Sequence, residues 1–158
     1  MLEKSIAKDG TLDSKLLDEL YYEILDLSNL VVEYFQLNKK KNVKELGPQL
    51  MSFYTVECNR MTTGIMQAMS WCLMQKGVRS GEVTAQEASE KHSRLTNNDL
   101  FNEPIGCDTD NFPEDFLMYS GRARSLYGKI VRLDRILYET PDRDENPVQG
   151  LLDKIEEL

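Results

Sequence analysis

Residues 65–74 read IMQAMSWCLM, and eight of these ten residues are apolar. Only Gln67 and Ser70 interrupt the run, so a helix through it has no fully polar face and is expected to be buried on all sides. The run is too short for a membrane span, which needs about 20 apolar residues. Either this segment is the central member of the core, or a second copy of the chain covers part of it. The residues expected to pack in the core or in a dimer interface are Ile65, Met66, Met69, Trp71 and Leu73.

The helix that contains this run extends in both directions. Pro48 suits the first turn of a helix and Gly81 suits its end, which predicts a helix from about residue 48 to residue 79. Gly64 lies in its middle, where glycine costs about 1 kcal/mol relative to alanine. Small neighbouring side chains would permit close approach of another backbone. The predicted buried stripe consists of Met51, Tyr54, Cys58, Met61, Ile65, Met69 and Cys72.

Upstream, apolar residues recur every three or four positions from about residue 12 to residue 41, which predicts a first long helix. It ends in Lys39, Lys40 and Lys41, cations that suit the negative end of the helix dipole. Two apolar stripes are typical of a helix that meets two neighbours. The first stripe consists of Leu16, Leu20, Ile24, Leu27, Val31 and Phe35, and the second of Leu17, Tyr21, Leu25 and Val32.

Downstream, Thr84 and Glu87 have the spacing of a capping box, which predicts a short helix to about residue 94. Residues 95–112 are rich in Asn, Asp, Gly and Pro and predict a long irregular connection. The last long helix is expected from Pro113 to about residue 140. Its predicted stripe consists of Phe116, Tyr119, Ala123, Leu126, Ile130, Leu133 and Leu137.

These elements predict an all-α fold, a bundle of three long helices with one or two short ones. At 158 residues the chain suits one domain, over residues 1–140. Residues 141–158 form an acidic tail whose apolar residues fit one short amphipathic helix. The first ten residues have no signal-peptide pattern, so we expect a cytoplasmic protein without a membrane segment.

The sequence lacks the residue patterns of the common enzyme and cofactor sites. A di-iron bundle needs two Glu-x-x-His motifs, and His92 is the single histidine, expected on the surface. Cys58 and Cys72 are not at zinc-site spacing, and with Cys107 they make an odd number, so we expect reduced thiols. There is no glycine-rich phosphate loop. We therefore expect no enzyme, no cofactor and no metal.

The last long helix carries a local excess of positive charge on a chain whose net charge is −8. One interpretation is that these cations pair with the acidic outer face of the first helix. Another is an electrostatic docking surface for a partner protein. Nucleic acid comes third, because the net charge is negative and no aromatic residues are interleaved. The candidate partner-binding residues are Arg122, Arg124, Lys129, Arg132 and Arg135.

Two blocks of sequence carry a family resemblance. Residues 60–75, RMTTGIMQAMSWCLMQ, with Gly-Glu at 81–82, resemble a segment of the alphaproteobacterial family called regulator of CtrA degradation. Residues 125–134, SLYGKIVRLD, resemble the last helix of that family. Gly64 and the tail after Thr140 depart from the family pattern.

The resemblance implies a small helical-bundle adaptor that works as a homodimer in the cytoplasm, including the cell pole. Such an adaptor helps deliver the cell-cycle regulator CtrA and other clients to the ClpXP protease. The partners that the resemblance implies are a response-regulator adaptor bound to ClpX, a cyclic di-GMP effector protein and the clients themselves. From the residues alone, a structural dimerisation module and a nucleic-acid-associated regulator stay open as alternatives.

Overall fold

The computed structural model describes residues 6, 10–37, 45–90, 94–95 and 98–139. Within them it contains no strand, only an isolated bridge between Ile6 and Leu12. The predicted all-α fold, with three long helices and one short one, is confirmed. Its helices are α1 (Ser14–Leu37), α2 (Gly47–Ser80), α3 (Ala85–Ser89) and α4 (Glu114–Tyr138). The lysines at 39–41, His92 and the tail at 141–158 lie outside the described residues.

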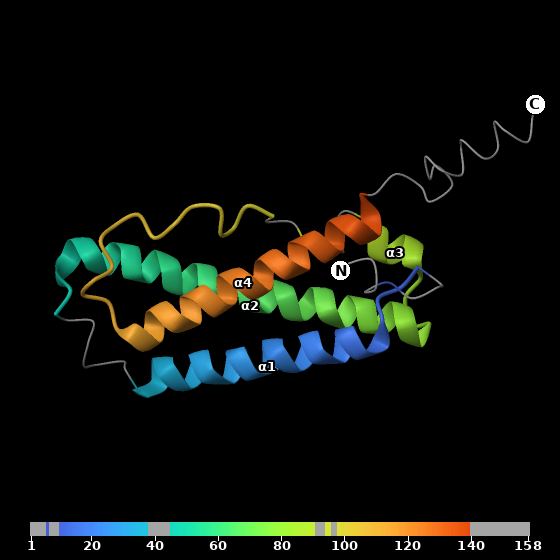
Figure 1. The fold of residues 1–158 in the computed structure, drawn as a ribbon, viewed down its shortest axis with the longest axis horizontal. Coiled ribbons are helices and arrows are strands. Elements are labelled where there is room, and N and C mark those ends of the chain that lie inside the picture. The colour runs from blue at the N-terminus through green and yellow to red at the C-terminus, as the bar shows by residue number, and fades with distance from the viewer. Residues whose placement is uncertain (1–5, 7–9, 38–44, 91–93, 96–97, 140–158) are drawn as a thin grey trace, which may run out of the picture.

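The three long helices pack side by side (Figure 1). α2 runs antiparallel to α1, and α3 caps the end of the bundle at which α2 finishes. The segment at residues 98–113, here called the return segment, runs back along the bundle to the start of α4. α4 therefore runs in the same direction as α2, an arrangement that requires such a long connection. None of the described helices has the length and apolarity needed to cross a membrane.

Local sequence signals set the helix ends. The side chain of Asp13 accepts from the backbone N–H of Leu16 at 3.1 Å, which caps α1. α2 has Pro48 in its first turn and ends at Gly81, whose φ of 80° is the left-handed conformation that glycine adopts at a helix end. The capping box of Thr84 and Glu87 is present, as predicted. α3 nevertheless ends at Ser89, well before residue 94, because the backbone turns extended at the next residue.

An aromatic cluster fills the end of the core where α1 finishes and α2 and α4 begin. The rings of Tyr54 and Phe116 lie 4.3 Å apart between centroids, and Phe112 packs edge-on against both. The hydroxyls of Tyr34 and Tyr54 are hydrogen-bonded at 3.1 Å. The predicted stripe of α4 is confirmed for most of its members: Phe116, Ala123, Leu126, Ile130 and Leu133 are buried, while Tyr119 and Leu137 are half-buried against the core.

The predicted stripe of α2 is confirmed for Tyr54, Met61, Ile65 and Cys72, which are buried. Met51, Cys58 and Met69 are only half-buried, whereas Glu57 and Gln75 are buried. The apolar pattern did not place Glu57 and Gln75 on the buried face, because it considered apolar residues only. Both polar side chains have hydrogen-bond partners on α4. The residues that form the buried face are Tyr54, Glu57, Met61, Gly64, Ile65, Ala68, Trp71, Cys72 and Gln75.

A single chain does not cover residues 65–74 on all sides, so the first alternative, a segment central to the core of one chain, is wrong, and cover by a second copy stays a prediction. Ile65 and Trp71 lie in the core, and Met69 is half-buried. Met66 and Leu73, however, are exposed to 66% and 51%. The second predicted stripe of α1 is confirmed in part: Leu17 is buried and Tyr21 is half-buried against the core, whereas Leu25 and Val32 are exposed. The bundle thus leaves apolar side chains of α1 and α2 uncovered.

Candidate partner-binding site on helix α4

Glu57 lies within the buried face of α2 and is fully buried. Its carboxylate accepts two hydrogen bonds from Arg124 of α4, from Nε at 3.1 Å and from Nη2 at 2.8 Å. The hydroxyl of Ser120 donates to the same carboxylate at 2.8 Å, and Arg60 donates to it at 3.4 Å. A buried carboxylate is tolerated only when it is paired and hydrogen-bonded. These four side chains therefore form one unit that joins α2 to α4.

Arg124 also holds the return segment against the bundle. Its Nη1 donates to the backbone carbonyls of Phe101 at 3.0 Å and Glu103 at 2.9 Å. Arg60 reaches the carbonyl of Pro104 at 3.4 Å. The Arg124 guanidinium also lies 5.2 Å from the centre of the Phe101 ring. The candidate residue Arg124 is thus an internal link rather than a free surface cation.

Asp134 is a second fully buried carboxylate, on α4. It accepts from the indole N–H of Trp71 at 2.9 Å and from two nitrogens of Arg94, at 3.2 and 2.8 Å. Arg94 also contacts Glu139 at 2.7 Å, and its hydrogen bond to Asp134 raises the pKa of the guanidinium. Arg94 is therefore tied to the end of α4.

Gly64 allows the return segment to lie close to α2. A Cβ atom at this position would lie 2.6 Å from Cε2 of Phe101, closer than real contacts allow. The Phe101 ring packs edge-on against Tyr127, with centroids 5.4 Å apart. This close approach explains why a glycine lies in the middle of α2.

The other candidate cations have different surroundings. Arg122 pairs with Asp26 at 3.2 Å and Lys129 pairs with Glu23 at 3.3 Å. Both partners lie on the outer face of α1. The interpretation that the cations of α4 pair with this acidic face therefore holds for Arg122 and Lys129. Arg132 is exposed, and Arg135 is separated by 4.0 Å from the Glu139 carboxylate.

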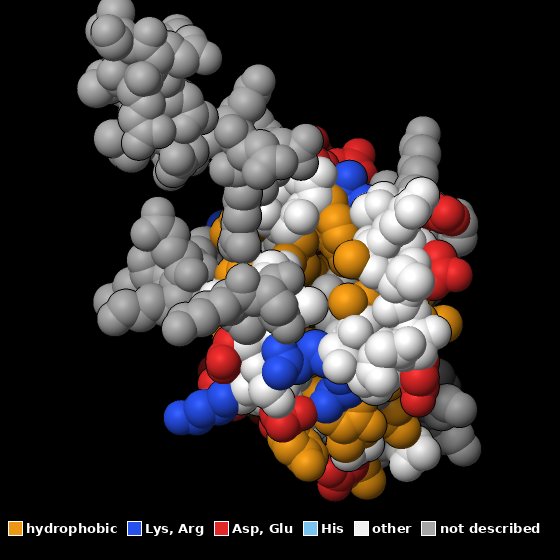
Figure 2. All heavy atoms as spheres, turned by 90° about the vertical axis from the view of Figure 1, so that its right-hand side faces the viewer, with side chains coloured by type: hydrophobic (Ala, Val, Ile, Leu, Met, Phe, Trp, Pro, Cys, Tyr) orange, Lys and Arg blue, Asp and Glu red, His pale blue; other side chains and the backbone are white. Residues whose placement is uncertain are grey.

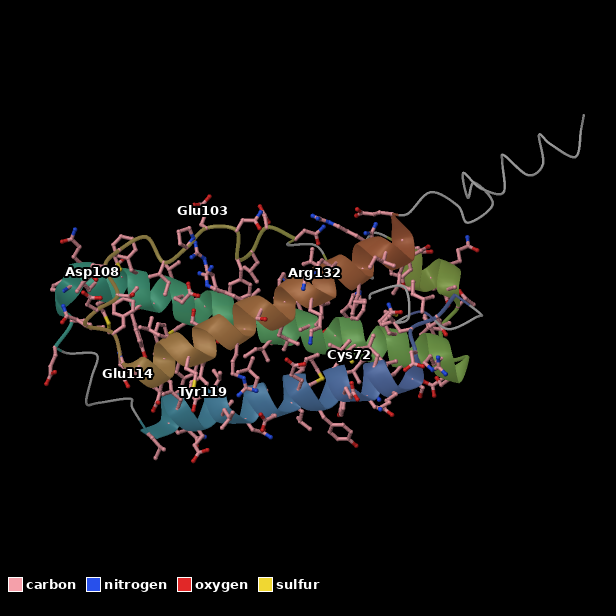
Figure 3. All side chains as sticks on the ribbon, in the orientation of Figure 1. Cys72, Glu103, Asp108, Glu114, Tyr119 and Arg132 are labelled. Carbon is pink, nitrogen blue, oxygen red and sulfur yellow. The ribbon has the colours of Figure 1, made fainter. Side chains whose placement is uncertain are left out.

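A shallow cleft of about 270 Å³ lies between α4 and the return segment. It is lined by Asn98, Phe101, Asn102, Arg124, Tyr127, Gly128, Val131, Arg132 and Arg135. Figure 3 labels Arg132 on α4 and Glu103 on the return segment. Burial, followed by the charges of Asp134 and Asp99, raises the pKa of Tyr127 to about 12, so its hydroxyl stays protonated and donates to Gln67 at 2.6 Å. Carboxylates are thus close to the cleft, but none lines it.

Within the described residues, no three His, Cys, Asp or Glu side chains are grouped as a metal site would require. The three cysteines are not disulfide-bonded. Burial raises the pKa of the Cys58 and Cys72 thiols to about 11, so they remain protonated and poor nucleophiles at neutral pH. Figure 2 views the molecule from the side of α3, where charges of both signs are interspersed with apolar patches.

Sequence reasoning missed the two buried carboxylates and Arg94. One signal was available for Glu57, because it continues the helical spacing of Tyr54 and Met61 and so falls on the buried face. An isolated acid on such a face indicates a buried partner. The partner itself could not be located, because Arg124 lies 67 positions further along the chain.

The described structure is a three-helix bundle whose return segment is held in place by buried arginine–carboxylate pairs. The chain belongs to a family described as "Protein of unknown function (DUF1465)", whose model matches residues 8–158. Among solved structures, it is similar to RcdA from Caulobacter crescentus CB15, with 26% sequence identity and a TM-score of 0.65. The match covers 82% of this chain and 96% of that one. No curated protein matches the chain. The resemblance to the regulator of CtrA degradation family is confirmed.

Proposed function

We propose that this chain is a non-enzymatic adaptor in regulated proteolysis, which helps deliver CtrA and other clients to the ClpXP protease. The observation that supports this proposal is the similarity to RcdA, which extends over most of both chains. The architecture suits the role, because three packed helices and a tied return segment form a rigid scaffold with its side chains available for partner contacts.

An adaptor acts by raising the effective concentration of a client near the protease. Linking two binding events in this way increases overall affinity by large factors without strong individual contacts. The proposed partners are a response-regulator adaptor bound to ClpX, a cyclic di-GMP effector protein and CtrA-type clients. The candidate contact residues are the α4 cations that lie at the surface, above all Arg132 and Arg135.

We also propose that the adaptor is a homodimer that covers the exposed apolar side chains of α1 and α2. Lys76 of α2 lies over the Tyr21 ring and bonds to Asp18, so these edges of α1 and α2 adjoin. Helical periodicity places Leu25 and Val32 on that edge of α1, and Met66 and Leu73 on that edge of α2. The four side chains, here called the apolar seam, form the kind of surface that a second copy buries.

The proposed function is tested by reconstituted degradation of purified CtrA with ClpXP, the response-regulator adaptor and the cyclic di-GMP effector. We expect this chain to accelerate loss of CtrA and to remain intact itself. Arg132→Glu should slow delivery, whereas Lys15→Glu, an equal charge change at an exposed position of α1, should not. Degradation that is equally fast with and without the chain would contradict the adaptor role.

The apolar seam also favours a second candidate, a structural dimerisation module. That candidate predicts that charge reversal on α4 leaves every function intact. Loss of client delivery in Arg132→Glu, with helix content and oligomeric state unchanged, would exclude it.

A further inference from the structure

The cleft between α4 and the return segment carries an unbalanced positive charge. Its lining contains Arg124, Arg132 and Arg135 and no acidic residue. Glu57 neutralises Arg124. The side chain of Arg132, in contrast, has no hydrogen bond or ion pair within the described part of the chain, and the side chain of Arg135 has only the 4.0 Å contact to Glu139. Two guanidinium groups, one turn of α4 apart, therefore remain available to a ligand.

The cleft also offers apolar surface and space. Because Gly128 has no side chain, the α4 backbone is uncovered at this point. Only Nη1 of Arg132 lies within 4 Å of the position that a Cβ atom of residue 128 would take. Val131 lines the cleft beside it and supplies an apolar contact. At about 270 Å³ the cleft is smaller than typical small-molecule sites of roughly 300–1,000 Å³. Its size suits part of a peptide.

The carboxamide of Asn98 gives a further indication of the ligand. Asn98 lines the cleft, and its side-chain oxygen is buried without a hydrogen-bond partner among the described residues. Buried acceptors are usually satisfied, so a ligand whose binding uncovers this oxygen and brings an N–H donor would complete the site. Peptides carry such donors on every residue except proline.

We propose that this cleft binds an acidic, partly apolar peptide segment of a partner protein. A carboxylate of the segment accepts hydrogen bonds from Arg132 and Arg135, and an adjacent apolar side chain rests over Gly128 against Val131. Arginine suits this role because its planar donors match a carboxylate. The inference deepens the proposed function, on which it rests, by naming the chemistry of the contact.

A nucleic acid fits the same arginines less well. Asp99 is close enough to affect Tyr127, and Glu103 and Glu139 are exposed nearby. A nucleic acid carries a charge on every phosphate and would meet repulsion on either side of the arginines, whereas a peptide can place uncharged residues there. Single-strand binding also needs aromatic faces on which bases stack. Here the Phe101 ring is occupied by Tyr127 and by the Arg124 guanidinium.

The test is fluorescence anisotropy with the full chain and a labelled peptide, Gly-Glu-Asp-Leu-Glu-Leu-Gly. The control peptide replaces each acidic residue with its amide. We expect saturable binding of the acidic peptide that weakens as salt is added, and binding of the amide peptide at least about tenfold weaker. Equal binding of both peptides, or no binding of the acidic peptide, would overturn the proposal.

Two variants test the location. Arg132→Glu should weaken binding of the acidic peptide by about tenfold or more. Lys15→Glu makes the same charge change on α1 and should leave this binding unaffected. Gly128→Leu fills the cleft without changing charge, and the open space at this glycine means that the helix accepts it. It should also abolish binding. Peptide binding that survives both Arg132→Glu and Gly128→Leu would place the contact elsewhere.

A labelled 20-base-pair DNA duplex serves as the competing probe. Preferential binding of the duplex at the same salt concentration, lost in Arg132→Glu, would assign the cleft to nucleic acid and overturn the peptide proposal. The outcome is independent of the protease assay. If the acidic peptide does not bind but the chain still delivers CtrA, only the proposal for this cleft is excluded. If the peptide binds but the chain has no effect on degradation, only the adaptor role is excluded.

Discussion

Trp71 donates its indole N–H to Oδ1 of Asp134 at 2.9 Å, so the single tryptophan of the chain is joined to a fully buried carboxylate. The other carboxylate oxygen accepts from Arg94, which belongs to the segment after α3. One buried group thus connects α2, α4 and the chain between them. Because the fluorescence of Trp71 depends on its surroundings, it reports directly on this junction.

Replacement of Asp134 tests how much the junction contributes. Asp134→Ala leaves the Trp71 N–H and the Arg94 guanidinium without their shared acceptor, and removal of one partner of a buried ion pair costs about 3–5 kcal/mol. Asp134→Asn keeps an acceptor for Trp71 and should cost less. Urea unfolding followed by Trp71 fluorescence measures both. Equal stability of the two variants would show that the hydrogen bond to Trp71 contributes nothing.

Gly64→Ala should have opposite effects in two backgrounds. In the natural chain the new Cβ would meet the Phe101 ring at 2.6 Å, so the ring must shift and the variant is expected to be less stable by about 1 kcal/mol. In a Phe101→Ala background the obstacle is removed, and the higher helix propensity of alanine should stabilise by up to about 1 kcal/mol. Urea unfolding of the four chains gives the comparison. The same sign in both backgrounds would contradict a steric role for Phe101.

Arg124 should control the protection of the return segment. Arg124→Gln removes the guanidinium that donates to the carbonyls of Phe101 and Glu103 and also leaves the buried Glu57 without its main partner, so the whole bundle should lose stability. Amides near Phe101 and Glu103 should therefore gain more in exchange rate than those in the middle of α1, which report only the global loss. Arg122→Gln is the control, because it removes only an exposed pair with Asp26, which is worth about 0–1 kcal/mol. Hydrogen exchange with mass spectrometry reads both segments. Unchanged exchange in Arg124→Gln would contradict the role of this arginine as a link.

Alkaline pH should destabilise the bundle through its buried thiols. Burial raises the pKa of Cys72 from 9.0 to about 11, so the folded state favours the neutral thiol. The associated stability is full below pH 9 and is lost as pH rises towards 11, by an amount of order 3 kcal/mol at most. Urea unfolding from pH 8 to pH 11 should therefore show a shallower decline for Cys72→Ala than for the natural chain. Parallel pH profiles would contradict this contribution.

The sequence predicted those features that depend on neighbours within a few residues. Local patterns predicted the capping box at Thr84, the proline and glycine at the two ends of α2, and the apolar stripe of α4. Contacts between distant positions were not accessible in this way. Arg124 and Arg132 are both arginines of α4, yet Arg124 pairs with the buried Glu57 whereas Arg132 is exposed.

The same limit explains why residues 65–74 are only partly covered within one chain. Periodicity counts how many apolar residues lie around a helix, but it does not say how many neighbours the helix has. α2 meets α1 and α4 and the return segment, and these leave the edge with Met66 and Leu73 uncovered. An apolar residue on the third side of a three-helix bundle therefore looks like core in the sequence.

Adjacent residues on α2 separate folding from self-association. Ile65 is buried, so Ile65→Lys places an unpaired charge in the core and should unfold the chain. Met66 is 66% exposed, so Met66→Lys should preserve helix content and the stability of the monomer but interrupt the apolar seam. Sedimentation velocity should then show a monomer for Met66→Lys and a dimer for the natural chain. Met118→Lys, at an exposed methionine of α4, is the matched control and should remain dimeric. A dimer that persists in Met66→Lys would mean that two copies meet through some other face, because a lysine ammonium at the centre of a close-packed interface has no counterion there.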